Sequence, residues 1–142
     1  MMLLLIFISF IGFVLSAVIH LCSLFRIYES PREIKILIQI GIIAVFYPSW
    51  FISEKMRKEE NITDYKKAIL GVCPKWMLIL NSFLLVYAFA GLLYSLFIKQ
   101  IIGAANKDFR GFSGHWMALY FLTFTILYCC KRLRNGKSNL PG

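Results

Sequence analysis

The sequence predicts an all-α membrane protein with four transmembrane helices in an antiparallel bundle. The chain of 142 residues is 59% hydrophobic, whereas soluble domains are typically about 45–50% apolar. Its apolar residues gather in four blocks, and the connections between the blocks carry the charged residues. One block, from Trp76 to Ile98, has no charged side chain and has the length of about 20 residues that a helix needs to cross a bilayer core.

The first helix is expected over residues 3–25. No Lys or Arg precedes this run, and Leu15 stands where a cleavage site would need a small residue. The run is also longer than the ~7–15 apolar residues at the centre of a signal peptide. We therefore interpret it as an uncleaved transmembrane helix.

The second helix is expected over residues 31–52. Ser30 and Glu33 have the spacing of a capping box, with Pro31 at the first helical position. Pro48 lies inside the apolar part, where it removes a backbone N–H and should kink the helix or leave a carbonyl without its usual donor.

The charged connection 53–74 is predicted to contain a short surface helix that ends at Gly71. Thr63 or Asp64 could cap its start. We expect its apolar residues to face the membrane; these are Ile69, Leu70 and Val72.

The third helix is expected over residues 75–98. Asn81, Ala88 and Ser95 recur every seven residues, with Gly91 on the same side. Small and weakly polar residues at this spacing let helices approach closely, so a packing face is the main interpretation. A substrate path lined by Asn81 and neighbouring tyrosines is the alternative.

The fourth helix is expected over residues 114–130, with Ser113 as its N-cap. A basic tail follows at 131–142. Since no connection is long enough for a further domain, residues 1–142 are expected to form a single integral membrane domain.

Net charge is +9, from 16 Lys plus Arg against 7 Asp plus Glu. The basic residues flank the apolar blocks, where they meet lipid phosphates, so a nucleic-acid partner is not expected. In a four-helix chain both termini and the middle connection share one side, which carries most of the basic residues. The positive-inside rule therefore predicts that both termini are cytoplasmic.

The four cysteines form no C-x-x-C pair. Cys129 and Cys130 are adjacent, and adjacent cysteines rarely bond to each other. We interpret all four as free, small hydrophobic residues, with lipid acylation near the membrane as the alternative.

Two histidines are expected at the same end of the bundle, and they define the candidate sites. The free N–H groups at the start of the last helix favour an anion, so a lipid head group could bind there to Arg110, Ser113, Gly114 and His115. A helix cap with interfacial anchors is the simpler reading. A haem ligated by His20 and His115 is a further alternative. No metal site is assigned, because a zinc site needs more ligands than these two histidines. No catalytic residue and no other cofactor is assigned.

The stretch 110–117, R-G-F-S-G-H-W-M, with Tyr120 following, resembles a motif in a family of small uncharacterised bacterial multi-pass membrane proteins. Pro74-Lys75-Trp76 with Tyr87-Ala88 is similar to that family's third segment, and His20 also fits. The resemblance implies a bacterial inner-membrane location and the same architecture, and it implies no activity.

The expected function is binding or association in the inner (plasma) membrane. The protein could be an accessory subunit, a lipid-associated factor or an immunity-type protein, with the lipid bilayer, other membrane subunits or a second copy as partner. The alternative is a redox or lipid-modifying membrane enzyme that uses the end of the bundle with His20 and His115.

Overall fold

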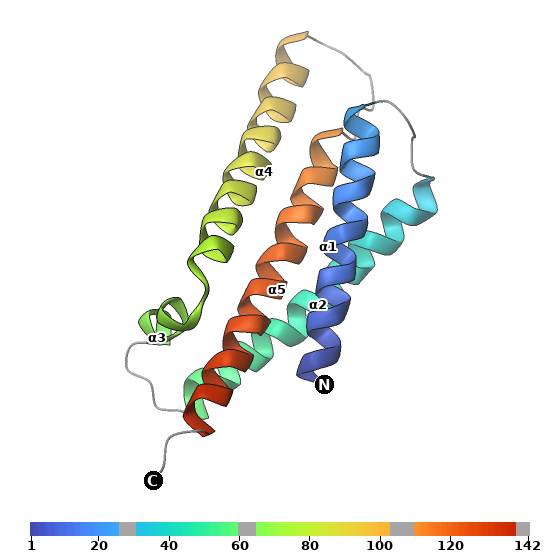
Figure 1. Cartoon of the computed structure of the whole chain (residues 1–142). Helices are drawn as coiled ribbons and strands as arrows, with labels where there is room; N and C mark the ends of the chain where they lie inside the picture. The colour runs from blue at the N-terminus through green and yellow to red at the C-terminus, as the bar shows by residue number, and fades with distance from the viewer. Residues whose placement is uncertain (26–30, 60–64, 103–109, 139–142) are drawn as a thin grey trace.

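The computed structural model describes residues 1–25, 31–59, 65–102 and 110–138, and this part of the chain is all-helical, as the sequence predicts (Figure 1). It contains five helices: α1 (Met2–Leu24), α2 (Arg32–Glu59), α3 (Tyr65–Val72), α4 (Lys75–Ile102) and α5 (Arg110–Ser138). The first and last helices bring the two chain ends to the same end of the molecule (Figure 1).

The three later long helices extend beyond the expected boundaries. α2 continues past residue 52 to Glu59, α4 continues past residue 98 to Ile102, and α5 reaches Ser138. Lys, Arg, Glu and Met are good helix formers, so leaving the apolar region does not end a helix. The start of α2 at Arg32 is close to the prediction, while Ser30 of the expected capping box lies outside the described residues.

Three of the described helices are long and apolar enough to cross a membrane. These segments are Met2–Leu24, Arg32–Lys58 and Lys75–Tyr94. They correspond to the first three expected spans. The α5 helix, which was expected as the fourth span, is not apolar enough to be included with these three.

The α5 helix lies at the centre of the molecule, between α1 and α4 (Figure 1). It packs most extensively against α1, then α4, α2 and α3. No residue from Gly114 to Lys131 is exposed. By contrast, α1, α2 and α4 expose large apolar side chains along their lengths, which is the surface that lipid would cover.

Close packing between α1 and α5 depends on small residues. The residues of α1 that are buried form a stripe along one face: Leu5, Ser9, Gly12, Ser16 and His20. The hydroxyl groups of Ser9 and Ser16 donate to the carbonyls of Leu5 and Gly12, at 2.6 and 2.7 Å. Both serines thus satisfy their own polar groups and leave a narrow surface for α5.

Tyr120 of α5 joins three helices. Its ring lies against Gly12 of α1, and its hydroxyl reaches Gly41 of α2, so a side chain at either glycine would overlap it. The hydroxyl donates to the carbonyl of Ile38 at 2.9 Å. The two glycines therefore leave the space that this buried aromatic ring occupies.

The contact between α4 and α5 confirms part of the expected packing face. Leu84 and Ala88 of α4 are buried against Ala118 and Phe121 of α5. Asn81, one turn before Leu84, is half-buried with its Oδ1 atom enclosed. The side chain of Ser95 lies outside the described part.

The short helix α3 packs on the C-terminal half of α5. A cluster of Met56, Cys130 and Leu133 is covered by Ile69 and Val72, among other residues. The expectation that these two α3 residues face the membrane is therefore wrong, whereas Leu70 is exposed. Cys130 lies within the predicted helix and Leu133 lies beyond it, so the extension of α5 adds to this surface.

Cys73 and Cys129 form a disulfide, with Cα atoms 5.2 Å apart. The interpretation of these two cysteines as free is wrong, while Cys22 and Cys130 form no disulfide. Cys73 lies between α3 and α4, and Cys129 lies in the second half of the antiparallel α5. Only this pairing of helix ends brings the two sulfur atoms together.

Candidate functional site

The first candidate site is the polar contact around His20. The side chain of His20 is buried in α1, and its Nε2 atom forms a hydrogen bond of 2.7 Å with the hydroxyl of Tyr87 in α4. The two rings also meet edge to face, with centroids 5.5 Å apart. The histidine therefore links α1 to α4 by a hydrogen bond and an aromatic contact.

Gly114 of α5 lies beneath both rings. A Cβ atom at this position would stand 3.2 Å from the Tyr87 ring and 3.6 Å from the His20 ring. The glycine thus lets three helices meet around one polar pair. This arrangement accounts for His20 as a structural link, because a buried imidazole needs a hydrogen-bond partner.

His115 follows Gly114 and is half-buried, with its Nε2 atom enclosed. Successive helical residues point about 100° apart, so His115 leaves α5 in a different direction from the face that meets His20. Among the described residues, no group of three or more His, Cys, Asp or Glu side chains could hold a metal ion. Haem ligation by His20 and His115 stays a prediction.

The start of α5 changes the expected anion site. The helix begins at Arg110, so the N–H groups of Ser113, Gly114 and His115 lie inside it and not at a free end. Ser113 as N-cap is therefore wrong, and the helix-end argument for an anion is lost. The side chains of Arg110 and Ser113 lie outside the described part, so their binding role stays a prediction.

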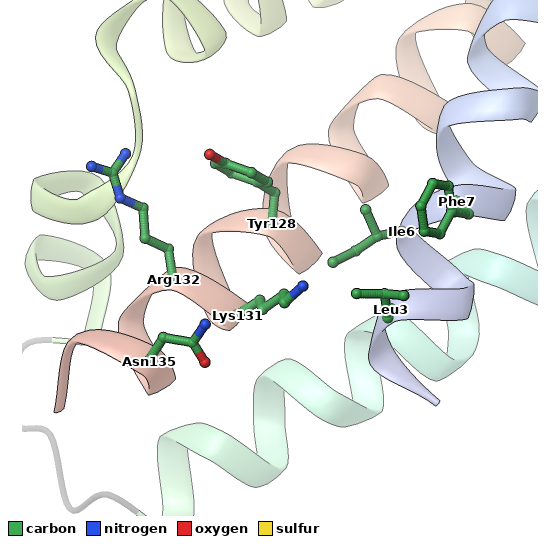
Figure 2. A pocket seen from close by; sticks show the side chains of 7 residues that line it. All are labelled: Leu3, Ile6, Phe7, Tyr128, Lys131, Arg132 and Asn135. Carbon is green, nitrogen blue, oxygen red and sulfur yellow. The ribbon is translucent and has the colours of Figure 1, made fainter. Parts of the chain in front are cut away.

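A second candidate site lies at the opposite end, where a cavity of about 400 Å³ opens between α1 and α5. Figure 2 shows the side chains that line it, which are Leu3, Ile6, Phe7, Tyr128, Lys131, Arg132 and Asn135. The α1 wall is entirely apolar, whereas the α5 wall is polar and basic. The cavity is therefore amphipathic.

The two basic side chains stand on either side of the α5 wall. Lys131 extends towards α1, and Arg132 extends towards the α3–α4 connection, with Tyr128 between them (Figure 2). None of the described lining residues is a carboxylate. The local electrostatic potential is therefore positive, and an anion is the charge that the cavity favours.

The cavity lies where the apolar runs of two helices end. Leu3 stands in the first turn of α1, at one end of a segment that is long and apolar enough to cross a membrane. Lys131 is the first charged residue after the uncharged run of α5.

Sequence reasoning missed this cavity because its two walls are at opposite ends of the chain. The basic run that begins at Lys131 was interpreted as residues that meet lipid phosphates and set the orientation, with no apolar wall opposite it. The apolar start of α1 has no polar residue that would predict a binding site. The missing information was that α1 packs against α5.

Comparisons with known protein families, with curated proteins and with solved structures found no match. The resemblance of stretch 110–117 to a bacterial membrane family therefore stays a prediction.

Proposed function

We propose that the chain is a multi-pass protein of the bacterial inner membrane that acts by binding a lipid within a four-helix transmembrane bundle. It is thus the lipid-associated form of the binding function expected from the sequence. The observation that carries this proposal is the amphipathic cavity between α1 and α5. Its apolar wall and basic wall match the two parts of a membrane lipid.

The surfaces around the cavity support a membrane setting. Three helices are apolar enough to span a bilayer, and they expose large apolar side chains. α5 is the fourth span in this proposal, because α1, α2, α3 and α4 cover it. A helix that is enclosed by others does not need a lipid-facing composition on every side.

The orientation that we propose places both termini in the cytoplasm, as the positive-inside rule favours. The Cys73–Cys129 disulfide weighs against this orientation, because it lies near the end of the bundle with both termini, and cytosolic thiols are kept reduced. A reporter fused to the C-terminus distinguishes a cytoplasmic from a periplasmic position of the termini. Activity of a cytoplasmic reporter supports the proposal, and activity of a periplasmic reporter contradicts it.

Native mass spectrometry of the protein, purified in mild detergent from its host, tests the lipid-binding function. We expect a retained lipid on the 16.4 kDa chain. Ile6→Trp, which fills the cavity, should release the lipid, whereas Leu4→Trp on the exposed face of α1 should not. A chain without lipid, or one that retains only a stoichiometric protein partner, would contradict the proposal.

A further inference from the structure

We propose that the cavity between α1 and α5 selects an anionic phospholipid, with its phosphate at the basic wall of Lys131 and Arg132 and an acyl chain against Leu3, Ile6 and Phe7. This inference rests on the proposed lipid-binding function and names the class of lipid. In this arrangement the lipid phosphate lies at the basic wall of the cavity, and the acyl chain lies against the apolar wall.

Charge is the first argument for this ligand. Lys131 and Arg132 are consecutive, so their side chains leave α5 about 100° apart and flank Tyr128 (Figure 2). Within the described part of the chain, no carboxylate forms an ion pair with either of them. A phosphate at the cavity would meet the amino group of Lys131 on the side that faces α1, and Arg132 adds positive potential on the other side of Tyr128.

A hydrogen-bonding group adds to this recognition. Tyr128 lies on the same wall, one helical turn before Lys131. Its hydroxyl can donate to phosphate or ester oxygens. The wall can therefore form a hydrogen bond to the head group in addition to the ionic interaction.

The apolar wall is the second argument, and it favours a lipid over a free inorganic anion as the ligand. Leu3 and Phe7 are both more than half exposed at this opening, and Ile6 lies beside them. An inorganic phosphate would leave this surface uncovered, whereas an acyl chain would bury it. A cavity of about 400 Å³ holds a head group with the first part of a chain, and the rest of the lipid continues along α1.

The aromatic residues above the cavity extend this apolar surface. The ring of Phe124 is 6.1 Å from that of Tyr128 and 5.6 Å from that of Phe10. Phe10 is exposed on α1. These rings continue from the cavity towards the middle of the bundle, in the direction that an acyl chain takes in a bilayer.

The test compares lipid selectivity in nanodiscs of phosphatidylcholine with and without phosphatidylglycerol. Bound lipid is measured by native mass spectrometry after the intact protein is released from the nanodiscs. We expect enrichment of phosphatidylglycerol on the protein. The double variant Lys131→Gln with Arg132→Gln should lower this enrichment about 10-fold or more, since each basic residue near the surface contributes to binding an anionic lipid.

The matched control is Arg134→Gln. Arg134 lies on the same helix end and is exposed, but it does not line the cavity. Its replacement should change enrichment less than about 2-fold. The charge-conserving pair Lys131→Arg with Arg132→Lys should retain the enrichment, which shows that the fold tolerates changes at both positions.

The outcomes separate this inference from the proposed function. Equal retention of both lipids, unchanged by the double variant, would overturn the anionic selectivity and leave lipid binding intact. An equal effect of Arg134→Gln would overturn the cavity as the selective site. Full competition by millimolar inorganic phosphate would overturn a lipid as the ligand, and retention of no lipid at all would overturn both proposals.

Discussion

The α1 and α5 helices pack against each other along their lengths, yet they have different surroundings. One face of α1 is buried and carries small residues, while the rest exposes Leu, Ile, Val and Phe side chains. α5 has no exposed residue from Gly114 to Lys131, although it is the less apolar of the two. The apolar content of a helix in this bundle therefore follows its exposure at the bundle surface and not its burial.

The polar residues of α5 show why this composition is tolerated. Thr123 is buried and donates its hydroxyl to the carbonyl of Leu119 at 2.8 Å. Tyr120 donates to α2. In a low-dielectric setting these groups need partners, and neighbouring helices or the helix backbone provide them where lipid could not.

The largest expected difference is between leucines of the two environments. Leu127→Ala in α5 removes a side chain with no exposed surface and should lower the free energy of unfolding by about 2–5 kcal/mol. Leu37→Ala in α2, where the side chain is 70% exposed, should change it by about 0.5 kcal/mol or less. Reversible denaturation in mild detergent measures both. Equal losses would contradict the enclosed position of α5.

Glycine substitutions test the close approach of α1. Gly12→Ala places a methyl group into the ring of Tyr120 and should cost about 1–3 kcal/mol of unfolding free energy through overpacking. Gly71→Ala in α3 meets open space and should be neutral or slightly stabilising. Denaturation of the two variants side by side provides the measurement. A stable Gly12→Ala protein would mean that Tyr120 does not fill the gap between α1 and α2.

A smaller effect is expected at the link between α1 and α4. Tyr87→Phe retains the ring and removes the hydrogen bond to His20, so it should cost about 0.5–1.5 kcal/mol. Tyr94→Phe on the same helix removes a hydroxyl from a residue that is 67% exposed and serves as the control. Thermal unfolding in detergent resolves the two. Equal midpoints would show that the His20–Tyr87 contact adds no stability.

Much of the fold could be predicted because apolar blocks and helix formers act locally. The α1 range and the start of α2 follow directly from this pattern. Helix ends were less predictable, because Lys and Glu are good helix formers and a helix can continue after its apolar run ends. The extension of α5 adds Leu133 to the surface on which Ile69 and Val72 pack.

The candidate sites were harder to predict because they depend on which helices are neighbours. His20 was identified from its residue type, but its contact with Tyr87 requires α1 and α4 to meet across Gly114. The Cys73–Cys129 disulfide likewise depends on antiparallel helices far apart in sequence. Neither pairing leaves a spacing pattern that a single sequence reveals.

The central claim, that α5 is enclosed while α1 faces lipid, can be tested on the unmodified protein through its native thiols. Cys22 of α1 is partly exposed, and Cys130 of α5 is fully buried. In native membranes, a lipid-soluble maleimide should label Cys22, while Cys130 should react about tenfold or more slowly until the protein unfolds. Cys73 and Cys129 should remain unlabelled until the protein is both reduced and unfolded. Labelling of Cys130 as fast as Cys22 in the folded protein would contradict the claim.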